Sequence, residues 1–129
     1  SDVFHHLAFV PLIVTVGLTF KWGPLRLVLA FFISGLPGGL DYFFLTLVKR
    51  GMMDKMTEKN LMRHLNVWCR APMLVLFAGT VYSIWLYSKS PHSSLIVDAI
   101  MFVTVGFVVY NALYYGDMAV GNYYSWKTE

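Results

Sequence analysis

Four apolar stretches separated by short polar ones set the pattern of this chain. They run from about residue 7 to 20, 25 to 48, 71 to 87 and 95 to 115. A membrane-spanning helix needs roughly 17–25 mainly apolar residues, so each stretch predicts one span, the first with help from its flanks. We therefore expect an all-α integral membrane bundle of about four transmembrane helices, folded as a single domain over residues 1–129.

The second apolar stretch is interrupted by Gly35-Leu36-Pro37-Gly38-Gly39, and Asp41 follows at once. Pro37 has no N–H to donate, and glycines loosen a helix. Inside a membrane, the freed backbone groups must be satisfied by packed protein, water or a ligand. A carboxylate there is costly in lipid, which makes Asp41 a candidate functional residue. The alternative is a glycine-rich surface for close helix packing, with Asp41 near an interface.

The segment Met52–Arg70, between the second and third spans, mixes charged and apolar residues. Leu61, Leu65 and Trp68 lie at positions i, i+4 and i+7, so a helix here has an apolar face opposite a basic one. This pattern predicts one interfacial amphipathic helix that then turns inward. A polar connector is the alternative.

Turn and capping signals bound the expected helices. Gly23-Pro24 predicts a turn before the second span, with Pro24 in the first turn of the helix. Gly51 suits the C-terminal cap of that span, and Thr57 can cap the helix that follows. The tail carries three aromatic residues typical of an interfacial belt, Tyr123, Tyr124 and Trp126.

Composition and charge agree with a membrane protein. Hydrophobic residues make up 57% and charged residues 13%, against about 25% charged in ordinary soluble domains. With four spans, both termini and the loop after the second span share one side of the bilayer. Seven basic residues fall on that side (Lys49, Arg50, Lys55, Lys59, Arg63, Arg70 and Lys127) and three opposite (Lys21, Arg26 and Lys89). The positive-inside rule then places the termini in cytosol, matrix or stroma. The net charge of +3 requires no nucleic-acid partner.

His5 and His6 are the first candidates for chemistry. Neighbouring residues on a helix point about 100° apart, so we expect no metal held by both. One histidine could act as a general base near its usual pKa of about 6.5, or both could pack at the interface. Haem ligation together with His64 has only spacing in its favour. The single cysteine, Cys69, leaves no internal disulfide. We expect no cofactor beyond bound phospholipid.

Arg70 opens the third span, where its guanidinium could hold a lipid phosphate or extend to the headgroups. Asn66 and Asn111 are the other uncharged polar residues singled out near or within the spans. Further candidates for lipid binding are basic and aromatic residues beside the spans, namely Lys49, Arg50, Arg63 and Trp68.

A family resemblance follows from a set of these residues. Asp2-x-x-His5-His6 heads a span, Gly23 lies in the next turn, the second span is interrupted, and Asn66 and Arg70 open the third. Over about residues 2–87 this resembles the TLC-domain family, which includes ceramide synthases and translocating-chain-associated membrane proteins.

The resemblance implies an all-helical bundle with a lipid-accessible cavity. By position, His5 and His6 would match the acyl-transfer histidines of the synthases, and Asp41 would lie near their acidic residues. The chain departs from the family at Gly38-Gly39-Leu40-Asp41, where the synthases carry a denser acidic cluster. It also has fewer spans than a complete TLC bundle, of which it would then be a segment.

These observations favour an accessory, non-catalytic membrane subunit that packs against other integral membrane subunits and binds lipid. The chain begins at Ser1 without a methionine or targeting region, so we expect an imported, processed subunit of a mitochondrial inner or plastid membrane complex. One alternative is a TLC-like lipid acyltransferase of the endoplasmic reticulum, with His5 or His6 as general base and Arg70 positioning the donor phosphate. Another is a lipid or sterol sensor without chemistry.

Overall fold

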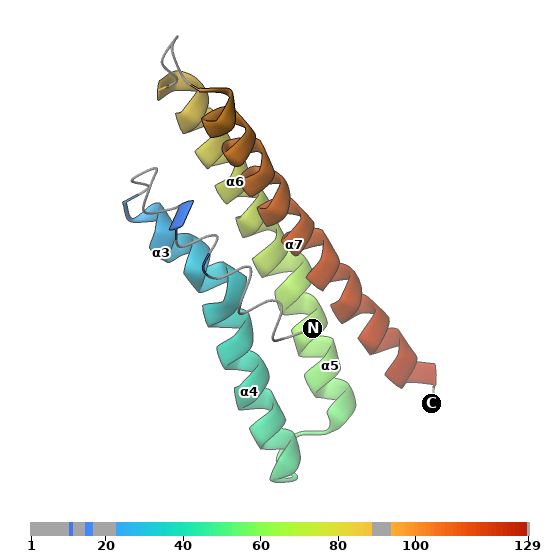
Figure 1. Cartoon of the computed structure of the whole chain (residues 1–129). Helices are drawn as coiled ribbons and strands as arrows, with labels where there is room; N and C mark the ends of the chain where they lie inside the picture. The colour runs from blue at the N-terminus through green and yellow to red at the C-terminus, as the bar shows by residue number, and fades with distance from the viewer. Residues whose placement is uncertain (1–10, 12–14, 17–22, 89–93, 129) are drawn as a thin grey trace.

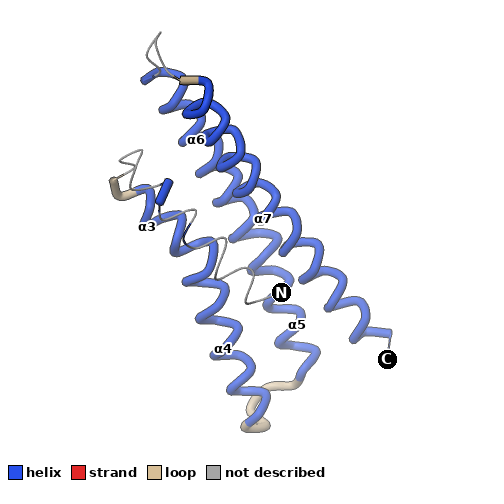
Figure 2. Tube along the Cα trace, in the orientation of Figure 1, coloured by secondary structure: helices blue, strands red, loops and turns tan. Residues whose placement is uncertain are grey.

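The computed structural model describes residues 11, 15–16, 23–88 and 94–128, and all regular structure in this part of the chain is helical (Figure 2). Within it, three continuous helices are long and apolar enough to cross a membrane: Leu27–Lys49, Lys55–Ser88 and Leu95–Thr128. They confirm the second, third and fourth predicted spans and an integral membrane protein. The first predicted span, residues 7–20, falls almost wholly outside the described residues, so a count of four stays a prediction.

The described chain forms three helical rods, shown in Figure 1. The first rod joins α3 (Leu25–Ala30), η2 (Phe31–Gly35) and α4 (Leu36–Lys49); the second joins α5 (Lys55–His64), η3 (Leu65–Arg70) and α6 (Ala71–Ser88); the third is α7 (Leu95–Thr128). The α4–α5 turn and the end of α7 lie at one end of the molecule, and the start of α3, the end of α6 and the start of α7 lie at the other (Figure 1). The basic α4–α5 turn and the tail therefore share a side, as the order of the predicted spans requires.

Pro37 does not break the first rod. In the preceding π-helix η2 the Leu36 N–H bonds the Phe31 carbonyl, five residues back instead of four. The wider turn brings Pro37 into the first turn of α4, where the proline ring is tolerated. One backbone group is still left over. The carbonyl of Ile33 would take its α-helical hydrogen bond from residue 37, and Pro37 has no N–H to give.

Gly51 ends the first rod as predicted. Its φ of 69° is in the left-handed region, which glycine adopts without steric cost. The Met52 N–H bonds the Leu47 carbonyl at 2.9 Å and the Gly51 N–H bonds the Val48 carbonyl at 3.0 Å. These two bonds form a Schellman motif, which satisfies the last carbonyls of the helix.

The second rod begins differently from the prediction. Asp54, and not Thr57, is the N-cap: its carboxylate accepts hydrogen bonds from both the N–H and the hydroxyl of Thr57. Thr57 lies inside the first turn. No separate interfacial helix is seen over Met52–Arg70, because α5 continues through η3 into α6 as one helix ending at Ser88. The amphipathic segment is the first part of one long continuous helix, Lys55–Ser88.

The orientation of that segment is also the reverse of a soluble amphipathic helix. Trp68 is 75% exposed and Leu61 39% exposed, whereas Glu58, Asn66 and Arg70 are buried. The buried residues fall at multiples of four along one face of the helix. Apolar side chains can face lipid at no cost, but polar side chains in a membrane must turn toward protein.

The apolar core lies mainly between α6 and α7. On α6, Leu74, Ala78, Val81 and Trp85 recur at steps of four, three and four, the spacing of one packed helix face, with Phe77 beside them. The α7 residues of the core are Met101, Val108 and Ala112, seven and four residues apart. Trp85 packs edge-to-face on Phe102 at a centroid distance of 5.3 Å. Leu29 and Ile33 of the first rod complete this core.

The second and third rods are longer than a bilayer is thick. Each of these two candidate spans has 34 residues, or about 51 Å at 1.5 Å per residue, whereas the hydrocarbon core of a bilayer is about 30 Å thick. The polar residues of α5 and of the last turns of α7 extend beyond the apolar part, on the basic side. There the Arg63 guanidinium lies 4.3 Å from the centre of the Tyr123 ring, so α5 and α7 remain in contact in the overhang.

Candidate functional site

Arg70 connects all three rods. Its guanidinium is buried, with the residue only 5% exposed. Nη1 donates to the Asn66 amide oxygen at 3.1 Å, and Nη2 donates to the Ile33 carbonyl at 2.6 Å and to the Asn111 amide oxygen at 2.9 Å. One side chain of the second rod thereby binds a backbone group of the first rod and a side chain of the third.

The hydrogen bond from Arg70 satisfies the Ile33 carbonyl that Pro37 leaves without a helical donor. The Ile33 carbonyl has lost its α-helical donor to Pro37, and the Arg70 guanidinium supplies a donor in its place. The sequence predicts that packed protein, water or a ligand satisfies this break, and packed protein does so. The predicted extension of the Arg70 side chain out to the headgroups is wrong, because the residue is buried and its terminal nitrogens Nη1 and Nη2 bind protein oxygens.

Neighbouring groups fix the orientation of the Arg70 guanidinium. The Tyr115 ring lies against it, with 4.2 Å between the guanidinium carbon and the ring centroid, a cation–π arrangement. The Asn66 amide nitrogen donates to the Met62 carbonyl at 2.9 Å, which turns its oxygen toward Arg70. Both Asn66 and Arg70 belong to the π-helix η3, and π-helical turns are frequent at functional sites.

A cavity of about 550 Å³ lies beside this cluster, between α4, α5, η3 and α7. Its polar wall comprises Asp41, Glu58, Lys59, Asn66, Arg70 and Asn122, and its less polar wall includes Pro37, Met62, Tyr115, Met118 and Ala119. Gly38 and Gly39 also line it, and a Cβ built on either would meet nothing within 4 Å. Gly38 and Gly39 in the second span therefore border open space. Within the described chain they do not make the close helix contact that the sequence offered as an alternative.

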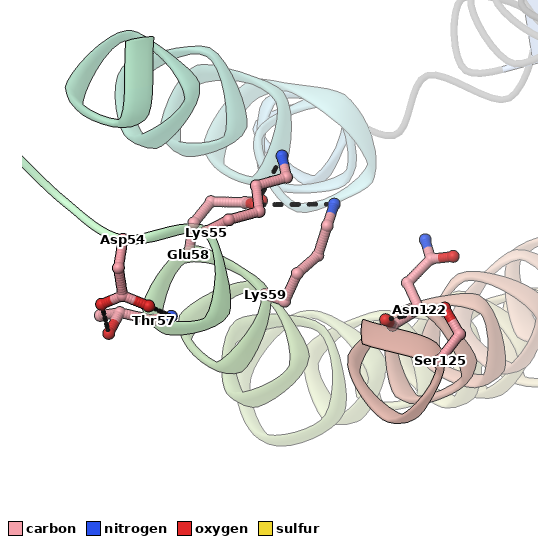
Figure 3. A network of polar contacts seen from close by, with 7 residues as sticks. All are labelled: Asp54, Lys55, Thr57, Glu58, Lys59, Asn122 and Ser125. Atoms are coloured by element: carbon pink, nitrogen blue, oxygen red, sulfur yellow. Dashed lines mark hydrogen bonds and ion pairs between the residues drawn. The ribbon is translucent and has the colours of Figure 1, made fainter. Parts of the chain in front are cut away.

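The charges around this cavity are unevenly paired. Glu58 is fully buried and lies 3.0 Å from the Lys55 ammonium and 3.5 Å from that of Lys59 (Figure 3). In contrast, the structure gives Asp41 and Arg70 no ion pair with any described residue. The Arg70 Nε also has no hydrogen-bond partner there. A half-buried carboxylate and a buried cation thus line one cavity without touching.

The sequence-predicted site residues are only partly brought together. Asp41 and Arg70 meet at the cavity, and Asn66 and Asn111 bind Arg70. The remaining lipid candidates are dispersed: Lys49 and Arg50 are exposed at the end of α4, Arg63 bonds Asn60 and stacks on Tyr123, and Trp68 faces outward. His5 and His6 lie outside the described residues.

Sequence reasoning missed Glu58, Lys59 and Tyr115 as site residues. A signal for Glu58 was available, because Glu58, Met62, Asn66 and Arg70 repeat every four residues and so share one helix face. A polar stripe at that spacing beside a membrane span indicates a protein-facing surface. Tyr115 carries no such signal, since its approach to Arg70 depends on how α7 packs.

No protein-family model, curated protein or solved structure matches this chain. The TLC-domain resemblance therefore remains a prediction from its motif residues. Among the described residues, no group of three or more histidine, cysteine, aspartate or glutamate side chains is placed to hold a metal ion.

Proposed function

We propose that this chain is a non-catalytic integral membrane protein that packs against a transmembrane helix of another membrane protein and contacts lipid. The observation that carries this proposal is an open groove of about 720 Å³ on the outer face of α6. Every described residue that lines it comes from this one helix: Val75, Leu76, Gly79, Thr80, Ser83, Ile84, Tyr87 and Ser88.

The groove has the chemistry of a helix contact in lipid. Gly79 leaves a notch, since a Cβ there would meet nothing within 4 Å. The hydroxyls of Thr80 and Ser83 donate to carbonyls of their own helix, each at 2.8 Å, so they add no unsatisfied polar group. Small residues of this kind let two backbones approach closely, which drives association where the hydrophobic effect between helices is absent.

The rest of the apolar surface also faces outward. Within the most apolar window of the three candidate spans, only 17%, 28% and 28% of residues are buried. The described helices therefore enclose no large interior of their own. The donors of Arg70 bind protein oxygens, which supports a structural cross-link more than a role in proton transfer.

Site-specific photocrosslinking tests the proposal. A photoreactive amino acid is placed at Thr80 in the groove and, as a matched control, at Val103 on the exposed face of α7. After irradiation in native membranes, the crosslinked peptides are identified by mass spectrometry. We expect position 80 to capture a transmembrane segment of a different protein, and position 103 to capture lipid.

Two further measurements sharpen the result. Gly79→Leu fills the notch and should abolish the crosslink, whereas Gly106→Leu on α7, which also has open space at its Cβ, should leave it intact. Capture at position 80 of residues 7–20 of the same chain, of a second copy, or of lipid alone would contradict the proposal.

A further inference from the structure

We propose that the cavity beside Arg70 binds the headgroup of a phospholipid carrying both a phosphate and a primary amine. The phosphate lies toward Arg70 and Lys59, and the ammonium lies toward Asp41. This inference rests on the lipid-contact part of the proposed function and assigns that contact a place and a headgroup chemistry.

The first support is the buried cation. Charges removed from water are normally paired, since leaving one uncompensated in a low-dielectric interior is costly. Arg70 is 5% exposed, yet every described acceptor of its hydrogen bonds is a neutral oxygen. Its Nε has no hydrogen-bond partner among the described residues. A phosphate oxygen in the cavity would supply both the missing negative charge and the missing acceptor.

The second support is the carboxylate facing the same space. Asp41 lines the cavity and has no ion pair with a described residue, although Arg70 lines it too. Because no ion pair joins the two charges, an occupant that contacts both must carry a negative group for Arg70 and a positive group for Asp41. Lys59 adds a second cation on the wall, since Glu58 is held more closely by Lys55, at 3.0 Å, than by Lys59, at 3.5 Å.

Depth and size fit a headgroup. Arg70 and Tyr115 lie where the apolar parts of the second and third rods begin and end, and Lys59 and Asn122 lie further out in the polar overhang. The cavity therefore spans the boundary between hydrocarbon and headgroup layers. Its volume of about 550 Å³ is within the roughly 300–1,000 Å³ of sites that hold small ligands. Met62, Met118 and Ala119 offer apolar contact to the first carbons of the lipid.

The carboxylate selects the kind of headgroup. A primary ammonium can donate charge-assisted hydrogen bonds to Asp41, but a quaternary ammonium has no N–H to donate. A headgroup with phosphate and hydroxyls only would satisfy Arg70 but would bring no cation to Asp41, which has no ion pair with any described residue. We therefore expect ethanolamine-type headgroups to bind more tightly than choline or glycerol headgroups.

The test measures lipid binding to the purified full chain by native mass spectrometry in a non-ionic detergent. Phosphatidylethanolamine, phosphatidylcholine and phosphatidylglycerol with identical acyl chains are titrated separately. We expect phosphatidylethanolamine to bind about tenfold more tightly than the other two, the ratio that one additional charge-assisted hydrogen bond supplies. Equal affinities for the three lipids, or a preference for phosphatidylglycerol, would overturn the proposal.

Two variants locate the effect. Asp41→Asn should remove the preference for ethanolamine, and Lys59→Gln should weaken all three phospholipids. Their matched controls are Asp117→Asn and Lys127→Gln, exposed residues that do not line the cavity, and both should behave as wild type. An unchanged preference in Asp41→Asn, with a wild-type circular dichroism spectrum, would also refute the assignment. If a variant misfolds, the headgroup series on the wild-type protein still decides.

A last pair of experiments separates the sources of the ligand and the two proposals. Soluble O-phosphoethanolamine should not displace the lipid at equal concentration. Displacement would mean that the cavity recognises a free phosphate compound without its acyl chains, and would overturn the assignment as a lipid site. Gly79→Leu should keep the headgroup preference. Loss of the crosslink at position 80 with the preference intact therefore separates failure of helix packing from failure of the lipid site.

Discussion

Replacing Arg70 by methionine removes three hydrogen bonds at once and tests whether this side chain holds the rods together. Polar contacts within membrane proteins contribute about 0.6 kcal/mol on average and about 1.7 at most, so three give roughly 2–5 kcal/mol. The lost contact with Tyr115 adds about 0.5–2 kcal/mol. Relief of a buried charge offsets part of the sum. From the sum of these contributions, we expect Arg70→Met to lower the free energy of unfolding by about 2–4 kcal/mol.

A double-mutant cycle with Pro37→Ala isolates the bond to the backbone. Alanine at position 37 has an N–H, so the Ile33 carbonyl regains its α-helical donor and no longer depends on Arg70. Arg70→Met should then cost less in the Pro37→Ala background, by about 0.6–1.7 kcal/mol, the contribution of one such bond.

Reversible unfolding in mixed micelles, followed by far-ultraviolet circular dichroism, measures all four proteins. Arg63→Met is the control, because Arg63 bonds within its own helix and stacks on Tyr123 in the polar overhang. It should cost less than about 1 kcal/mol. Strictly additive effects of Pro37→Ala and Arg70→Met would show that Arg70 does not compensate for the proline.

Three further predictions concern the α4–α5 connection and the histidines. Gly51→Ala, forced into a φ of 69°, should destabilise by about 1–2 kcal/mol in the same unfolding assay. The control Gly79→Ala, inside α6 with open space at its Cβ, should instead be as stable as wild type or more stable by up to about 1 kcal/mol. Hydrogen bonds from Thr57 hold the pKa of Asp54 below its usual range. The stability that this cap contributes is therefore present above about pH 4 and is lost as pH falls through the lower folded-state pKa. The free energy of unfolding, measured from pH 6 to 2, should show this loss, and Asp54→Ala should reduce its dependence on pH. His5→Ala and His6→Ala should leave the crosslink at position 80 intact, and an acyl-transfer activity that they abolish would favour the enzyme alternative.

The membrane spans could be predicted from the sequence because their signals are local. Long apolar runs determine helices in lipid, and Gly51 marks a helix end through its own conformational freedom. The same local reasoning pointed to Pro37 as a place where a carbonyl needs a partner. It could not say which residue supplies the donor, because Arg70 lies 37 positions away and the contact depends on packing between rods.

The polar stripe shows where a rule for soluble proteins does not apply. Leu61 and Trp68 form an apolar face that in water would turn inward, yet here Trp68 faces outward and Glu58 is buried. The surrounding solvent decides which face of a helix is hidden, and that information is absent from the periodicity itself. The cavity could not be predicted for the same reason, since Glu58 and Lys59, which line it, belong to the helix face that we expected to be exposed.

The overhang of the two long helices gives the molecule a mechanical property. A helix of about 51 Å in a bilayer with a hydrocarbon core of about 30 Å has roughly 20 Å left in the aqueous layer, and this free part moves when the embedded part changes its tilt. Helices adjust their tilt when the hydrocarbon thickness changes, and a tilt of about 10° displaces the far end of such a rod by about 9 Å. The contact between Arg63 and Tyr123 makes α5 and α7 move together. A small change in membrane thickness is thereby converted into a sideways displacement of the basic end, large enough for a neighbouring protein to sense.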